Sequence, residues 1–171
     1  AYAYTNNGVW QEAGDLSSTT IAVGVPALAA YNGKIYVVWS AGDDLYGYAD
    51  HLELAVWHGD QWTAAQPLPI NTGYLDMADL SFAPDGQLHL VWNGNQTNTP
   101  SNHNAYQIYY STLRQGVWSS PVNIGNTATY SFYPTIAVDT AGRVHVAWME
   151  EDKGDQGQGG HIFDRILYNR L

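Results

Sequence analysis

The chain has 171 residues, which is enough for one domain with a real core and too few for two of ordinary size. It carries 16 Asp and Glu against 6 Lys and Arg, and its formal net charge of −10 disfavours binding to nucleic acid and to anionic lipid. The absence of Cys excludes disulfides, thiolate catalysis and Cys-based zinc sites. Because the net charge is negative, neutral or cationic ligands are favoured. No apolar run is long enough for a membrane helix.

A hairpin pattern recurs along the chain and indicates β-structure. Residues 28–39 (LAAYNGKIYVVW), 80–92 (LSFAPDGQLHLVW) and 136–148 (IAVDTAGRVHVAW) each consist of an apolar strand, a tight turn and a second strand that ends in Trp. The turns are Asn32-Gly33, Pro84-Asp85-Gly86 and residues 139–142, and Gly with Asn or Asp is typical of the turns in β-hairpins. We call these strands a and b.

A second pattern alternates with the first along the chain. Residues 4–10 (YTNNGVW), 55–62 (AVWHGDQW) and 110–118 (YSTLRQGVW) each predict a strand c, a turn and a strand d that opens with Trp. Six of the seven Trp therefore fall at two positions of the repeat: Trp39, Trp92 and Trp148 on strand b, and Trp10, Trp62 and Trp118 on strand d. The simplest interpretation of these side chains is packing between neighbouring sheets.

Four antiparallel strands in a tandem repeat of about 55 residues predict an all-β fold, a β-propeller of four-stranded blades. We expect one partial-propeller domain over residues 1–171, with three blade-equivalents. Its parts in chain order are residues 1–22 (strands c and d of a split blade), 23–72 (a blade), 73–127 (a blade) and 128–171 (strands a, b and c of the split blade).

Three blades do not close a ring, and an open arc would expose Trp-rich faces and unpaired strand edges. We therefore expect a head-to-tail homodimer that closes a six-bladed ring, in which the strand d of one copy completes the blade begun by the other. Residues 2–5 and 166–171 both look like strand c, so one of them is redundant in this arrangement. The rival interpretation is a piece of a larger propeller.

Segments such as YPTIAVDTAGRVHVAW and QIYYSTLRQGVWSSPVNI resemble the repeats of sialidase-like propellers, which carry BNR or Asp-box repeats. The Asp-box is degenerate here, because Ser111, Gly116 and Trp118 are present with one extra residue and no Asp. In that family the motif folds the turn between strands c and d. The resemblance supports the propeller fold and a secreted or cell-surface location, and it leaves the activity open.

A sialidase of this family uses three arginines to hold the substrate carboxylate. The chain has only four arginines, and we place Arg114 and Arg143 in hairpin turns on the face opposite the usual ligand site, with Arg165 and Arg170 on the last strand. These positions do not make a triad, so the sequence argues against sialidase activity.

His89 and His145 share one repeat position, which Tyr36 occupies in the first repeat. A position shared by His and Tyr indicates a half-buried packing site rather than a metal ligand.

The b–c loops and the d–a connections should emerge on the same face of the propeller. The b–c loops at 40–50, 93–104 and 149–160 are long and differ in sequence, which is where repeat scaffolds place function. The d–a connections also bring Phe132 and Tyr133 close to the channel mouth. The candidate sugar-binding residues on this face are Asp43, Asp44, Tyr46, Tyr48, Tyr74, Asp76, Asp79 and Tyr130.

Aromatic rings stack on sugar rings and carboxylates accept hydrogen bonds from hydroxyls. The alternative is that the Tyr pack the loops and the Asp cap turns. A separate acidic run supplies hard oxygen ligands suited to Ca²⁺, although it matches no EF-hand spacing and also fits a solvated loop. Its members are Glu150, Glu151, Asp152 and Asp155.

No cofactor is required by these patterns. We expect a non-catalytic carbohydrate-binding module, lectin-like in character. The first alternative is a glycoside hydrolase that pairs Asp76 or Asp79 with Glu150, and the second is a scaffold piece of a larger propeller with no ligand of its own.

Overall fold

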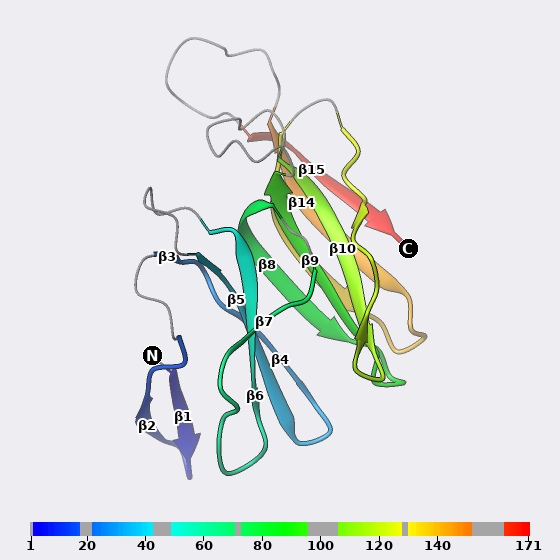
Figure 1. The fold of residues 1–171 in the computed structure, drawn as a ribbon. Coiled ribbons are helices and arrows are strands. Elements are labelled where there is room, and N and C mark those ends of the chain that lie inside the picture. Colours follow the sequence, from blue (N-terminus) through cyan, green and yellow to red (C-terminus); the bar gives the residue numbers. More distant parts are fainter. Residues whose placement is uncertain are drawn as a thin grey trace.

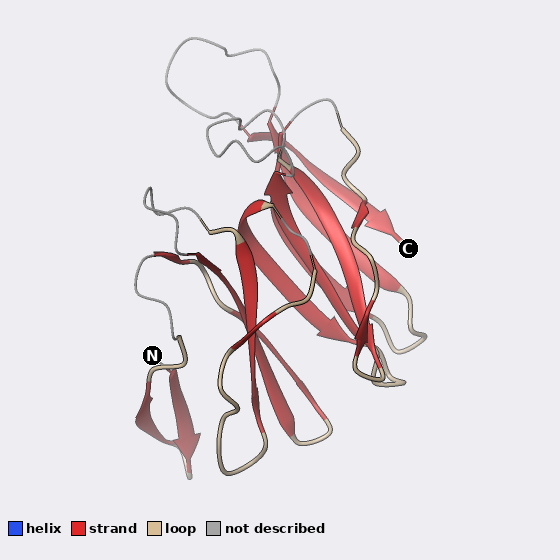
Figure 2. Cartoon of the chain, viewed as in Figure 1, coloured by secondary structure: helices blue, strands red, loops and turns tan. Residues whose placement is uncertain are grey.

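The computed structural model describes residues 2–17, 22–42, 49–70, 73–95, 106–127, 130–151 and 163–171. These residues form strands, turns and loops, and no helix occurs among them (Figure 2). Consequently, none of the described segments is a helix that would be long and apolar enough to cross a membrane.

The strands of the described residues form antiparallel sheets that follow one another in chain order (Figure 1). Sheet A consists of β1 (Tyr2–Asn6) and β2 (Val9–Gly14). Sheet B consists of β3 (Ala22–Val23), β4 (Ala27–Tyr31), β5 (Lys34–Gly42), β6 (His51–Trp57) and β7 (Gln66–Pro67). Sheet C consists of β8 (Tyr74–Phe82), β9 (Leu88–Asn95), β10 (Gln107–Arg114), β11 (Val117–Trp118) and β12 (Val122–Asn123). Sheet D consists of β13 (Tyr130–Val138), β14 (Val144–Glu151) and β15 (Phe163–Arg170).

The three a–b hairpins predicted from the repeat are confirmed. They are the antiparallel pairs β4 with β5, β8 with β9 and β13 with β14. In the first of them Asn32 (φ 49°) and Gly33 (φ 73°) both have left-handed backbone, as a type I′ turn requires. The turn chemistry read from the sequence therefore fixes the register of this hairpin.

Strand d is shorter and more broken than the repeat predicts. Trp62 makes an isolated bridge to Trp57, and only β7 continues that strand, while β11 and β12 divide strand d of sheet C between them. One side of strand d is the sheet edge, so fewer ladder hydrogen bonds hold it in a regular conformation.

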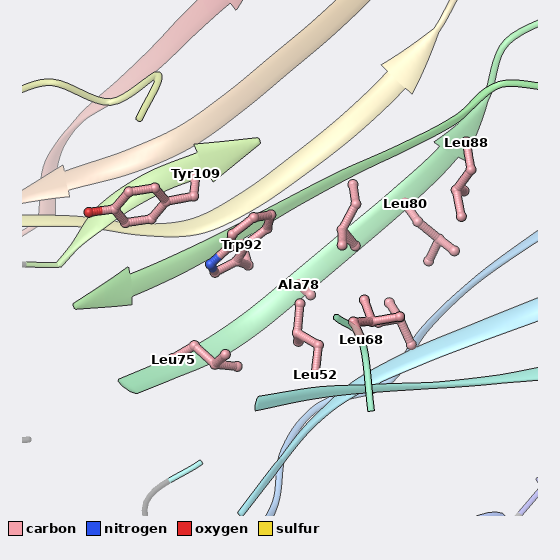
Figure 3. Packing of buried hydrophobic residues seen from close by; sticks show 10 residues of the cluster. Leu52, Leu68, Leu75, Ala78, Leu80, Leu88, Trp92 and Tyr109 are labelled. Atoms are coloured by element: carbon pink, nitrogen blue, oxygen red, sulfur yellow. The ribbon is translucent and has the colours of Figure 1, made fainter. Parts of the chain in front are cut away.

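The core lies between the sheets, because successive side chains of one strand point to opposite faces. On β5, Val38 packs toward sheet C, whereas Val37 and Trp39 belong to the cluster on the other face of sheet B. Figure 3 shows the packing between sheets B and C, where Leu52 lies near Ala78 and Leu68. A further cluster fills the space between sheets C and D.

The tryptophans of strand b are buried at the sheet interfaces, as expected. Trp39, Trp92 and Trp148 are 3%, 0% and 5% exposed. On strand d, Trp62 is partly buried against the cluster that contains Trp39, and Trp118 is partly buried against the cluster that contains Trp92. Trp10 departs from this pattern, because it is 72% exposed. The expectation that all six pack between sheets is wrong for Trp10, since no described sheet lies on its side of sheet A.

The repeat position shared by His and Tyr is a packing site, as expected. His89 is 6% exposed and its Nδ1 lies 2.6 Å from the Tyr110 hydroxyl. His145 makes the same contact with Tyr168 at 2.7 Å. Each His therefore joins strand b to strand c of its own sheet.

Ser111 and Gly116 both help to form the turn between strands c and d of sheet C. Ser111 is fully buried, and its hydroxyl donates a hydrogen bond to the Ser119 carbonyl at 2.8 Å across the c–d hairpin. Gln115 (φ 51°) and Gly116 (φ 80°) form the tip of this hairpin. A Ser hydroxyl thus bridges the two strands of this hairpin.

Candidate functional site

The ends of the b–c loops lie beside the beginnings of the inner strands. The Leu75 amide donates to the Ala49 carbonyl at 3.1 Å, which joins the end of the first b–c loop to β8. The Ser131 amide donates to the Tyr106 carbonyl at 3.1 Å, which does the same for β13. One face of the molecule therefore carries both kinds of connection, as the topology predicts.

The inner strands β8 and β13 run parallel to each other. The Ile136 amide and the Thr135 hydroxyl donate to Asp79 Oδ2 at 2.9 Å and 2.8 Å. Two residues further along each strand, the Val138 amide donates to Ser81 Oγ at 3.2 Å. The contacts advance together along both strands. Residues the same number of positions before Asp79 and Ile136 therefore lie at the same height along the two strands, which we call the same level.

The ladder of each inner strand is interrupted at this level. On β8 the register shifts between Leu75 and Ala78, and on β13 it shifts between Phe132 and Thr135. In sheet B the corresponding break separates β3 from β4 at residues 24–26. β-Bulges often occur beside functional sites because they re-aim side chains, so this level is our candidate site.

The bulge of β13 presents Tyr133. This residue has left-handed backbone (φ 54°), which is costly for a residue with a bulky side chain, and it is 43% exposed. Its ring lies 6.2 Å from that of Phe132, which is itself stacked on Tyr106 at 5.3 Å. A strained backbone supported by packed aromatic rings thus holds one ring partly open to solvent.

The bulge of β8 presents Asp76. Asp76 lies three residues before Asp79, and Tyr133 lies three residues before Ile136, so the two are at matching positions on the neighbouring strands. Asp76 is exposed as a residue, yet partial burial of its carboxyl raises its pKa. The backbone opened by this bulge is held by Asn93, whose Oδ1 accepts a hydrogen bond from the Met77 amide at 3.1 Å. A buried amide therefore supports the segment that carries the carboxylate.

Gly24 lets sheet B approach this bulge. A Cβ at Gly24 would collide with Ser40 Oγ and lie 3.2 Å from the Asp76 carbonyl oxygen on β8. A larger residue would have to displace the buried Ser40 side chain, so Gly is favoured at this close approach of sheets B and C. Val25, which follows it, is 55% exposed, so the level combines an apolar, an acidic and an aromatic side chain from three sheets.

Four of the predicted sugar-binding residues fall within the described residues. Tyr74 is half-buried at the start of β8, Asp76 is exposed, and Asp79 is committed to β13. Tyr130 is only 7% exposed and packs beside Phe132, so its ring face is covered. The remaining four lie outside the described residues: Asp43, Asp44, Tyr46 and Tyr48.

The predicted calcium ligands are divided in the same way. Glu150 lies within β14, is 2% exposed, and its Oε2 accepts from Arg165 at 3.2 Å. Glu151 ends β14, but its side chain is not described, and Asp152 and Asp155 lie outside the described residues. The described residues contain no group of three or more metal-ligating side chains, and the calcium site stays a prediction.

The four arginines lie where the sequence places them. Arg114 and Arg143 are at the hairpin ends, beside Asp85 (3.5 Å) and Asp139 (2.6 Å), while Arg165 and Arg170 are on β15. Hydrogen bonds from the Arg143 backbone and guanidinium hold the pKa of Asp139 well below its usual value. These arginines support turns and strand edges.

Sequence reasoning placed Tyr133 near the channel mouth but did not include it in the ligand set. A signal was available, because Pro134 and Pro26 interrupt strand-like runs at equivalent repeat positions. Proline does not donate to the ladder and is therefore confined to edges and bulges. Two such prolines indicate a break in the inner strand at this level.

Antiparallel sheets stacked face to face, with inner strands side by side, define a β-propeller-like all-β fold. Among solved structures, a GH43_1 enzyme from Xanthomonas citri complexed with xylotriose has a TM-score of 0.55 at 14% identity over 88% of this chain and 51% of its own. A xylan β-1,4-xylosidase from Bacillus halodurans has 0.57 at 16% identity over 86% of this chain and 29% of its own. The Hadza microbial sialidase Hz136 has 0.56 at 14% identity over 77% and 33%.

These neighbours are glycoside hydrolases of the β-propeller type. At this level of identity the likeness shows the fold alone, and the chain spans about half or less of each neighbour's length. No protein family matches the chain. No curated protein matches it either, and membership of the BNR or Asp-box group stays a prediction.

Proposed function

We propose that the chain is a carbohydrate-binding β-propeller module that binds neutral oligosaccharides without cleaving them, at the bulges of β8 and β13. The observation that carries this proposal is the partly exposed Tyr133, held in left-handed backbone at the level of Asp76. An aromatic face suits the C–H face of a sugar ring, and a carboxylate on the adjacent inner strand suits its hydroxyls. The fold relation to carbohydrate-active propellers is consistent with this ligand class.

Glycoside hydrolysis is the second candidate, and the raised pKa of Asp76 favours it. A general acid of this reaction has a raised pKa, and a second carboxylate must stand about 5 to 9.5 Å away. Asp79 is bound to β13, and Glu150 is buried against Arg165. Neither of them presents an open carboxylate to the same space, so we rank binding first.

The test is a calorimetric titration with neutral oligosaccharides, including xylotriose, with reducing ends measured in the same samples. We expect saturable binding and no increase in reducing ends. Tyr133→Ala should weaken binding by about tenfold or more, as loss of a stacked aromatic anchor does. Asp76→Asn should weaken it less, since the amide retains hydrogen-bonding capacity.

Tyr31 provides the matched control, because it lies at the far end of its strand and stacks on Phe82 at 5.0 Å. Tyr31→Phe should leave the affinity unchanged. Release of reducing sugar that Asp76→Asn abolishes would favour the hydrolase. Equal affinity of the wild-type protein and Tyr133→Ala would overturn the proposed site.

A further inference from the structure

Strand c carries a repeated apolar pair in sheets B, C and D. The first member stands opposite the residue that follows the strand b Trp: Leu52 opposite Ser40, Ile108 opposite Asn93, and Ile166 opposite Met149. The second member is two residues further along: Leu54, Tyr110 and Tyr168. Because side chains alternate between faces, both members of each pair lie on the face directed toward the following sheet.

The burial of these equivalent residues differs sharply at the last sheet. Leu52 and Ile108 are both 0% exposed, the first packed against sheet C and the second against sheet D. Ile166 is 70% exposed and Tyr168 is 61% exposed. The outer face of sheet D thus repeats the composition of an interface between sheets, and no described residue of the chain covers it.

The opposite end of the row of sheets shows the complementary pattern. Trp62 of sheet B packs on Tyr2 at 5.2 Å, and Trp118 of sheet C packs toward sheet B, so both face the preceding sheet. Trp10 is paired with Thr5, so its side chain lies on the face of sheet A opposite to the face that carries Tyr2 and Tyr4. It is therefore the residue that would face a preceding sheet, and it is 72% exposed.

We propose that the outer face of sheet D, defined by Ile166 and Tyr168, docks against the amino-terminal hairpin of a second copy, with Trp10 among the residues it buries. Within the chain, the Leu52 face of sheet B is covered by the Trp92 face of sheet C. In the same way, the Ile108 face of sheet C is covered by the Trp148 face of sheet D. One copy carries both faces at opposite ends (Figure 1), so the contact is heterologous and head to tail.

Both hairpin strands stay paired with each other in this contact. β1 and β2 are hydrogen-bonded along their length, and β15 is already paired with β14. The two segments that both resemble strand c are therefore each accommodated in their own sheet. The contact needs no strand to be displaced.

Charge opposes this association and gives it a recognisable dependence on salt. Each copy has a formal net charge of −10, so two copies repel at low ionic strength. Screening shortens the range of that repulsion to about 8 Å at 0.15 M salt, while the apolar contact of Trp10, Ile166 and Tyr168 is retained. We expect association to strengthen as salt is raised.

The test is light scattering of the purified chain over a range of concentrations and salt. The expected mass is about twice 18.8 kDa, with dissociation on dilution and less dissociation at higher salt. A stable monomer at every concentration would overturn the proposal and would favour a longer chain or another protein as the occupant of these faces.

Substitutions separate the two faces. Trp10→Glu and Tyr168→Glu should each yield monomers, whereas Val117→Glu, at a site 70% exposed on β11, should leave the mass unchanged. Ile166→Glu replaces Tyr168→Glu if circular dichroism shows that the latter is unfolded. A mixture of the Trp10 and Tyr168 variants should recover dimers, because each keeps one intact face. Dimers that survive both substitutions would contradict the proposal.

Discussion

Asp79 shows how one side chain connects two sheets. Its Oδ2 accepts hydrogen bonds from the Ile136 amide and the Thr135 hydroxyl, and thereby sets the level of β13 against β8. The sequence suggested a ligand or a turn cap at this position, because an Asp near a loop fits either role. The partners lie 56 and 57 residues away, and no local pattern announces them.

We expect Asp79→Ala to lower the free energy of unfolding by about 2 kcal/mol, since it leaves the part-buried Ile136 amide without its acceptor. Urea denaturation measures the change. Arg114→Ala removes an exposed ion pair at 3.5 Å and should cost under about 1 kcal/mol. Equal effects of the two substitutions would show that Asp79 does not hold the sheets together.

His89 gives the stability a dependence on pH. Burial lowers the pKa of His89 below its usual value, against a weaker opposing effect of Asp85. The folded state therefore resists protonation more than the unfolded state does, and stability falls as the pH drops below about 6.5. Replacing the hydrogen-bonded pair by His89→Phe with Tyr110→Phe should reduce this loss between pH 7.5 and 5.5, measured by urea denaturation. An unchanged loss would contradict it.

At the scale of elements, the hairpins were predictable and the bulges were not. Turn residues and the spacing of Trp92 and Trp148 report local hairpin geometry, which the sequence encodes within a dozen residues. The left-handed backbone of Tyr133 occurs at a bulge beside Phe132, and the prolines at 134 and 26 are the sequence features that indicate such a break. The residues predicted from the sequence and the candidate site therefore share Asp76, whereas Tyr133 was outside the predicted set, and the site itself stays a proposal.

The strain at Tyr133 can be measured with two substitutions that both remove the ring. At φ 54°, Gly has no steric cost, whereas Ala retains the Cβ that makes this region unfavourable. We expect Tyr133→Gly to be more stable than Tyr133→Ala by about 1 kcal/mol. In an ordinary extended strand the order would be reversed, so thermal or urea denaturation of the pair distinguishes the two backbones.

At the scale of the molecule, the repeat defines both the shape and its open ends. Val38 and Trp92 lie on faces covered within the chain, whereas Trp10 and Ile166 lie on equivalent faces that the described residues leave uncovered. The sequence predicted incomplete blades at both ends of the chain. It did not show that β1 would pair with β2 and β15 with β14, each in its own sheet. The six-bladed ring stays a prediction that joins the hairpin of one copy to sheet D of the other as one blade. Our proposal for the uncovered faces differs from it, because in it sheet A of one copy packs on sheet D of the other as a separate sheet.

The most direct test of the proposed function is a crystal structure with the tightest-binding oligosaccharide from the titration. We expect an intact sugar ring stacked on Tyr133 with a hydroxyl within hydrogen-bonding distance of the Asp76 carboxylate. Sugar bound elsewhere on the molecule with the Tyr133 ring uncovered would contradict the proposed site, and cleaved sugar at Asp76 would contradict the non-catalytic role.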